Sequence, residues 1–168
     1  MNEHVGFTGG SILMDVGTEY DFLLFFECIN SFVAKKYPNK NWSVITDRLY
    51  RKYLASNELD IAYSLMNEIQ VEFRKIPINA ICIDYSKSRL KKMENGYLYN
   101  LFYDFFHCFL DCLESSKYSF EESRKNEDYR YEPVFTINTQ IPFYIMDKMK
   151  NLTEYDRNEG HPFWCSDN

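Results

Sequence analysis

Three ionisable residues with helical spacing are the first candidates for chemistry in this sequence. Asp104, His107 and Asp111 are three and four residues apart, so an α-helix would place them on one face. An imidazole between two carboxylates could act as a general base, or the three side chains could ligate a metal ion. A solvated helix edge explains the same pattern, because an amphipathic helix needs a polar edge in any case. We prefer the solvated edge, and keep a small hydrolase or metal-dependent enzyme as the alternative.

These residues belong to a very apolar segment, 97–114, with the sequence YLYNLFYDFFHCFLDCLE. Its polar residues form one narrow stripe, and aromatic and aliphatic side chains cover the rest of the helix. A membrane span needs roughly 20 apolar residues, and a charge near the bilayer centre costs on the order of 3 kcal/mol. The two carboxylates and the histidine therefore disfavour a membrane span and favour a central core helix with one solvent-exposed edge. Gly96 precedes this helix, and Ser115–Ser116 are expected to loosen its end.

The cysteines indicate free thiols rather than a metal site. There are five, mostly in apolar runs, which is typical of a reducing compartment. Cys108 and Cys112 lie one helical turn apart, but the second Cys or His pair that a zinc site needs is missing from the sequence, where His4 and His161 stand alone. Core packing is the expected role of the two cysteines, and no metal or other cofactor is predicted. The N-terminal residues lack the pattern of a signal peptide, so a cytoplasmic location is expected.

Length and charge limit the possible partners. The 168 residues suit one domain, and 18% of them are aromatic, enough for a substantial core. A net charge of −6 and a pI of about 5.1 disfavour binding to nucleic acid and favour association with a basic protein. The short basic run 87–92 is interpreted as a solvated loop or helix start. The glycines of 6–11 are interpreted as a turn before a strand, since a phosphate-binding loop would follow the strand.

Periodicity along the chain predicts a single α+β domain over 1–168, a small β-sheet packed with several helices. Alternating apolar residues predict strands in 7–17, 78–85 and 133–138. Apolar residues at helical spacing predict a helix capped by Thr18, one after Thr46 or Asp47, one capped by Asn57 and Asp60, and the central helix 97–114. The segment 141–152 fits either a helix or a strand, and 153–168 fits a tail anchored by Phe163–Trp164.

The polar segment 115–132 mixes carboxylates with tyrosines. Rigid aromatic side chains supply buried area in protein interfaces, and carboxylates steer a basic partner toward them. An ordinary solvated loop explains the same composition equally well. The candidate partner-binding residues are Glu121, Glu122, Glu127, Asp128, Tyr129 and Tyr131.

Three stretches resemble immunity proteins of bacterial polymorphic-toxin systems, including those of contact-dependent growth inhibition. They are GSILMDVG near the start, WSVITDRLYRKYL in the middle and IPFYIMDKMKNLTEYDRNEGHPFW at the end. The resemblance implies a small cytoplasmic, non-enzymatic protein that binds the C-terminal domain of a cognate toxin one to one and occludes its active site. Such toxins are often nucleases with basic surfaces, which an acidic inhibitor would fit. Toxin-binding residues vary among these proteins, so the resemblance assigns no site residue here.

Overall fold

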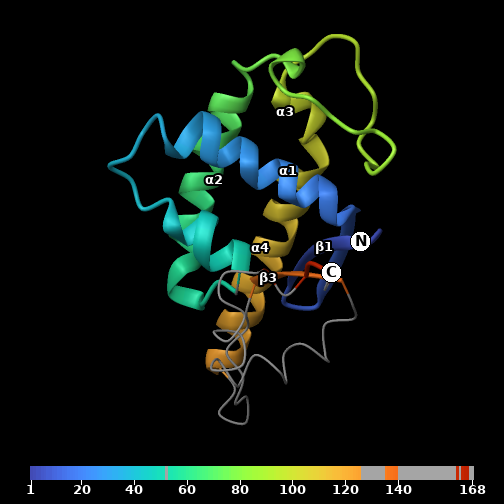
Figure 1. Cartoon of the computed structure of the whole chain (residues 1–168). Coiled ribbons are helices and arrows are strands. Elements are labelled where there is room, and N and C mark those ends of the chain that lie inside the picture. Colours follow the sequence, from blue (N-terminus) through green and yellow to red (C-terminus); the bar gives the residue numbers. More distant parts are fainter. Residues whose placement is uncertain (52, 126–134, 140–161, 163, 167–168) are drawn as a thin grey trace.

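A three-stranded antiparallel sheet lies at one side of the computed structural model (Figure 1), which describes residues 1–51, 53–125, 135–139, 162 and 164–166. The strands are β1 (Val5–Gly9), β2 (Ile12–Gly17) and β3 (Phe135–Asn138), in the order β2-β1-β3. Several helices pack beside the sheet, so the predicted α+β class is confirmed (Figure 1).

The glycine turn joins two strands rather than preceding one. Gly9 pairs with Ile12, so Gly10 and Ser11 form a two-residue hairpin loop, and Gly10 has a φ of 58°. Glycine adopts such a positive φ without steric penalty. The strand β1, which lies before the glycines, was not predicted, although it is the central strand and every one of its residues is buried.

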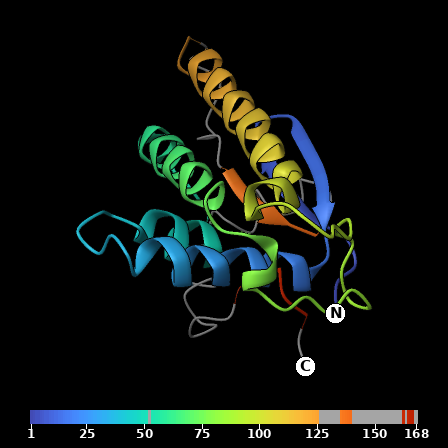
Figure 2. The ribbon, with the colours of Figure 1, turned by 90° about the horizontal axis from the view of Figure 1, so that it is seen from above.

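Helices make up most of the remaining described chain. The longer ones are α1 (Glu19–Ile29), α2 (Leu59–Phe73) and α4 (Tyr103–Lys125), and α3 (Leu98–Leu101) is a single turn. The shorter segments are the π-helical turns η1 (Asn30–Ala34) and η2 (Val44–Leu49) and the 3-10 turns η3 (Ser56–Glu58) and η4 (Ile78–Ala80). Figure 2 shows α2 and α4 side by side and α1 crossing them.

Phenylalanine rings fill the space between the helices and the sheet. The Phe25 ring of α1 lies 5.2 Å from Phe102 and 4.9 Å from Phe105, centroid to centroid, and Phe109 of α4 lies 5.7 Å from Phe7 of β1. All five side chains are at most 1% exposed. Burying a large apolar side chain contributes about 1.5–3 kcal/mol, so these rings contribute strongly to the stability of the fold.

The chain close to the C-terminus docks where the N-terminus lies. Trp164 is fully buried, and its indole Nε1 donates to the Tyr50 carbonyl oxygen at 2.8 Å. The Asn2 side chain donates to the Trp164 carbonyl oxygen at 2.9 Å. The predicted aromatic anchor is therefore confirmed for Trp164, while Phe163 and the predicted segment 141–152 lie outside the described residues.

The central helix is longer than predicted. It breaks once at Phe102, between α3 and α4, and then runs through Ser115–Ser116 to Lys125. The small serines permit close packing: a Cβ on Gly9 would lie 2.4 Å from the Ser116 hydroxyl oxygen. Ser115–Ser116 are the contact surface for the hairpin rather than the end of the helix.

Three other local predictions were wrong. The segment 78–85 forms the turn η4 and an irregular stretch, and its alternating isoleucines pack against the core from one side without a strand partner among the described residues. The η2 segment starts before Thr46, whose amide donates to the Trp42 carbonyl at 2.8 Å. The expected capping pair of Asn57 and Asp60 is not formed: the Ala55 amide donates to Glu58 Oε1 at 3.0 Å at the start of η3, and the N-cap of α2 is Glu58, without a capping hydrogen bond from its side chain.

Among the described residues, no helix has both the length and the apolarity that crossing a bilayer requires.

Candidate functional site

The outer face of α4 carries a continuous row of polar and aromatic side chains, which we call the α4 ridge. Its members recur every three or four residues and lie on one side of the helix. With a rise of 1.5 Å per residue, the row extends over about 27 Å. All are exposed except Asp111, which is partly buried. The α4 ridge consists of Asp104, His107, Asp111, Glu114, Tyr118, Glu121 and Glu122.

Most of the negative charge on the α4 ridge is left unneutralised by the described part of the chain. His107 lies 3.5 Å from Asp111, and Lys125 lies 3.1 Å from Glu122. No described cation is within ion-pair distance of the other three carboxylates, Asp104, Glu114 and Glu121.

The lysine nearest to the middle of the row, Lys117, points away from it. Lys117 forms an ion pair with Asp60 of α2, and its Nζ lies 5.5 Å from the Tyr63 ring centroid. The helix therefore presents carboxylates to the solvent and directs this cation to its neighbour.

Two exposed tyrosines flank these carboxylates. Tyr103, at the first turn of α4, is 51% exposed, and Tyr118, toward the other end, is 67% exposed. The Tyr103 ring stacks on His107, with 6.0 Å between centroids and 8° between planes. Aromatic side chains left in the solvent beside carboxylates are the kind of residue that protein interfaces use as anchors.

The helical row predicted for chemistry is present, but it lies on the surface. Asp104, His107 and Asp111 share one face of α4 as expected, and the His107 and Asp111 side chains are 59% and 41% exposed. The Nε2–Oδ2 distance of 3.5 Å is long for a hydrogen bond. Among the described residues, no group of three or more His, Cys, Asp or Glu side chains is arranged to hold a metal ion.

The structure describes only two of the six predicted partner-binding residues. Glu121 and Glu122 are exposed near the end of α4, while Glu127, Asp128, Tyr129 and Tyr131 lie outside the described residues. The α4 ridge joins the described pair to the acidic row that begins at Asp104. The sequence contained this signal, because the spacing of three or four residues continues through Tyr118, but the expected break at Ser115–Ser116 hid it.

A hollow of about 390 Å³ opens at the first turn of α4, and we call it the α4 hollow. Its apolar lining comes from β2, from the loop 89–93 and from the helix start. Two members of its wall, Tyr103 and Asp104, are also at the beginning of the row on α4. The full lining is Val16, Arg89, Leu90, Lys91, Met93, Asn100, Leu101, Tyr103, Asp104 and Phe105.

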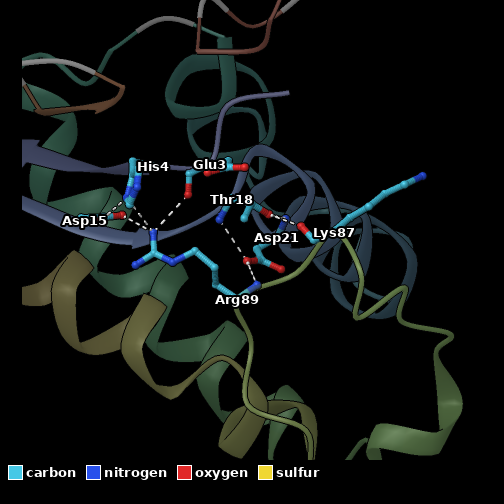
Figure 3. A network of polar contacts seen from close by, with 7 residues as sticks. All are labelled: Glu3, His4, Asp15, Thr18, Asp21, Lys87 and Arg89. Atoms are coloured by element: carbon cyan, nitrogen blue, oxygen red, sulfur yellow. Dashed lines mark hydrogen bonds and ion pairs between the residues drawn. The ribbon is translucent and has the colours of Figure 1, made fainter.

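The basic loop that walls the hollow is fixed by the N-terminal cap of α1 (Figure 3). The Thr18 side chain accepts from the Asp21 amide, and Asp21 accepts from the Thr18 amide at 2.9 Å, which is a capping box. The fully buried Asp21 carboxylate also accepts from the Arg89 amide at 3.0 Å and from the Ser88 hydroxyl. The Thr18 hydroxyl donates to the Lys87 carbonyl oxygen at 2.8 Å. The same cap therefore starts a helix and positions the loop.

Arg89 ties this loop to the hairpin. Its Nη1 donates to Asp15 Oδ1 at 2.8 Å and to the Glu3 carbonyl oxygen at 3.1 Å (Figure 3). Burial raises the pKa of the Asp15 carboxyl, but the hydrogen bonds and charges of Arg89 and His4 outweigh it and hold that pKa below its usual value. The positive charge of Arg89 is thus already paired.

His4 does not stand alone, as its place in the sequence suggested. Its Nδ1 lies 2.7 Å from Asp15 Oδ2, which makes Nδ1 the donor in that pair. The 3.2 Å approach of Arg89 Nη1 to the same nitrogen is then a contact between two donors rather than a hydrogen bond. The imidazole is exposed and outside the lining of the α4 hollow. The pairing of β1 with β2 brings His4 beside Asp15, and the sequence analysis missed it because β1 was not predicted.

The paired cysteines of α4 are part of the core. Cys112 is fully buried, and its thiol donates to the Phe7 carbonyl oxygen at 3.4 Å. Burial raises the pKa of the Cys108 thiol to about 11 and that of Cys112 to about 12, so neither is a ready nucleophile. The described structure confirms that all five cysteines are free.

A second hollow, of about 420 Å³, lies between η1 and α2, and its carboxylates are neutralised. Glu72 accepts from Tyr37 at 3.1 Å and pairs with Lys75 at 3.0 Å and Lys36 at 3.2 Å. The hydrogen bond from Lys75, helped by Lys36, holds the pKa of Glu72 below its usual value. This hollow has little net charge to offer a partner, in contrast to the α4 ridge.

No family model, curated protein or solved structure matches this chain.

Proposed function

We propose that this protein is an immunity protein: a cytoplasmic binding module that occludes the active site of a cognate toxin domain. The observation that carries the proposal is the α4 ridge, an exposed row of carboxylates whose charge is mostly unpaired within the described chain. A toxin that acts on nucleic acid needs a basic surface to hold phosphate groups. Such a surface and the α4 ridge have complementary charge, and the sequence as a whole carries −6.

Charge of this kind contributes to binding chiefly through the rate of association. Carboxylates along an exposed helix steer a basic partner from a distance, and salt screens the attraction over about 8–10 Å at physiological ionic strength. Like charges three or four residues apart on a helix also repel one another slightly. A basic partner relieves that repulsion, so the ridge is better suited to a complex than to the free protein.

The alternative is an enzyme that uses Asp104, His107 and Asp111. That hypothesis predicts a pocket lined by all three side chains, whereas only Asp104 belongs to the lining of the α4 hollow. It also predicts a hydrolytic activity, against a panel of chromogenic esters and phosphoesters, that the His107→Ala variant loses. Activity of this kind in the wild-type protein would favour the enzyme over the binding module.

The direct test first asks whether the gene immediately upstream encodes a toxin domain, and then pairs the protein with that upstream toxin domain. We expect a one-to-one complex, and we expect co-expression to protect cells from the toxin. The double variant Asp111→Lys, Glu114→Lys reverses two adjacent ridge charges. We expect its affinity to fall by about tenfold or more, mainly through slower association.

The matched control reverses two exposed carboxylates outside the ridge, Glu3→Lys and Glu27→Lys. Both double variants change the net charge from −6 to −2, so any difference between them reports the position of the charge and not its total. We expect the control to bind nearly as the wild type does. A toxin domain that the wild type neither binds nor neutralises would end the proposal.

A further inference from the structure

The α4 hollow is continuous with the row of carboxylates on α4. Tyr103 and Asp104 line the hollow, and Asp104 is also the first member of the ridge. A partner laid along the ridge would therefore cover the mouth of the hollow. Its volume, about 390 Å³, is at the lower end of the range for sites that enclose a ligand.

The lining of the hollow favours an uncharged occupant. Five of its members are apolar, and its charged members are of both signs: Arg89 is already paired with Asp15, and the other two are the cation Lys91 and the carboxylate Asp104. A charged side chain of either sign would be repelled by one lining residue, a cation by Lys91 and a carboxylate by Asp104. It would also lose its hydration on entering the hollow. An apolar side chain loses no ion pair when it enters. The apolar lining residues are Val16, Leu90, Met93, Leu101 and Phe105.

We propose that the α4 hollow receives an aromatic side chain of the basic partner, an inference that rests on the proposed function. The Tyr103 ring, which is 51% exposed, offers an edge or a face to an incoming ring. The Met93 thioether can contact the edge of the same ring. Lysines and arginines around the aromatic anchor then meet the carboxylates of the ridge, and this arrangement shields the anchor from water.

The wall of the hollow is held in place before any partner arrives. Asp21 accepts from the Arg89 amide, and Arg89 is bonded to the hairpin through Asp15 (Figure 3). Tyr103 is stacked on His107. A pre-formed hollow lowers the ordering cost of binding, which is a property of the sites that contribute most to an interface.

The test replaces a lining residue of the α4 hollow with a larger side chain that fills the space. Met93 is half-buried, and Met93→Trp would place an indole in the space reserved for the partner. Val71→Trp fills the second hollow, of similar volume and lined by no member of the ridge, and is the matched control. Titration calorimetry against the upstream toxin domain measures affinity, and stopped-flow mixing at several salt concentrations measures association.

We expect Met93→Trp to weaken binding by about tenfold or more, through faster dissociation, while the salt dependence of association stays that of the wild type. The Val71→Trp control should bind unchanged. Tyr103→Ala removes one wall of the hollow and supplies a second variant if Met93→Trp does not fold. Alanine substitution of one aromatic residue of the partner should show the same loss, and combined with Tyr103→Ala the two losses should not add.

The outcomes separate the two proposals. If wild type binds and both hollow variants bind equally well, the aromatic anchor is refuted and the immunity function stands. If the ridge variants weaken binding and association responds to salt, but no aromatic residue of the partner matters, the anchor is again refuted. If the wild type does not bind the upstream domain, the immunity function fails and the anchor fails with it.

Discussion

Around the N-terminus of α1 the carboxylates are buried and fully bonded, whereas along α4 they are exposed and mostly unpaired. Asp21 accepts from the backbone and side chains of two segments that are far apart in the sequence, and Glu19 accepts from Asn2 and Ser166. Asp104 and Glu114 have no cation within reach in the described chain. The same chemical group therefore serves the fold in one region and remains available to a partner in the other.

The difference has a physical basis. A carboxylate taken out of water must receive hydrogen bonds in return, and charge-assisted bonds contribute about 1.5–3 kcal/mol each. An exposed carboxylate on a helix keeps its hydration and contributes little to stability. Folding requires only that the exposed face of α4 be polar, so the proposed function rests on the sign of the charges there, five carboxylates on one face.

The largest expected effect is at Asp21. Asp21→Ala leaves the Thr18 and Arg89 amides without an acceptor and removes the cap of α1. We expect the free energy of unfolding to fall by about 3–5 kcal/mol, measured by urea denaturation followed through the fluorescence of the buried Trp164. Faster amide exchange at Arg89 should accompany the loss.

Asp21→Asn is the matched variant, since it keeps the shape and one acceptor oxygen and should lose less. If Asp21→Ala is as stable as the wild type, Asp21 contributes no more to folding than a carboxylate of the α4 ridge does, and the assigned difference between the two regions is wrong.

A smaller, pH-dependent effect is expected at Glu19. Burial raises the pKa of its carboxyl, but the hydrogen bonds from the Asn2 and Ser166 amides outweigh it and hold the pKa below the usual value of 4.5. Ionised Glu19 therefore stabilises the fold above pH 4.5, and this stabilisation is lost as the pH falls through the lowered folded-state pKa. Glu19→Gln should lower the free energy of unfolding by about 1–2 kcal/mol at pH 7.

The gap between Glu19→Gln and the wild type should narrow as the pH is lowered from 5 toward 3. Thermal unfolding at a series of pH values measures it. A gap that is constant with pH would contradict the assigned role of the ionised carboxylate.

The smallest expected effect on stability is on the ridge itself. Asp111→Asn combined with Glu114→Gln removes two like charges that lie three residues apart on α4. We expect the free energy of unfolding to change by less than about 0.5 kcal/mol, with a slight increase from the lost repulsion. A marked loss of stability would show that these carboxylates stabilise the fold, which would contradict their assignment to partner binding.

Local rules predicted the regions where neighbouring residues decide the structure. Thr18 caps α1 as expected, because a hydroxyl, two early acids and an apolar stripe all lie within a few residues. The core helix was expected from the row Asp104, His107 and Asp111, whose side chains do lie on one face. The strand at 133–138 is confirmed for Phe135–Asn138.

Contacts between distant segments decided the rest. The helix continues through Ser115–Ser116 because those serines meet the glycine turn of the hairpin, about a hundred residues away. The segment 78–85 alternates like a strand but finds no strand partner in the described chain. The α4 hollow needs the loop 89–93 beside the helix, and Asp21 brings it there. A short window of sequence contains no information on these contacts between distant segments.

The most direct test of the central claim, that the α4 ridge grips a basic protein, is the association rate with the upstream toxin domain as a function of salt. For the wild type we predict a rate that falls steeply as salt rises, and for Asp111→Lys, Glu114→Lys a slower rate with a weaker dependence. Rates that are the same for both proteins at every salt concentration would contradict the claim.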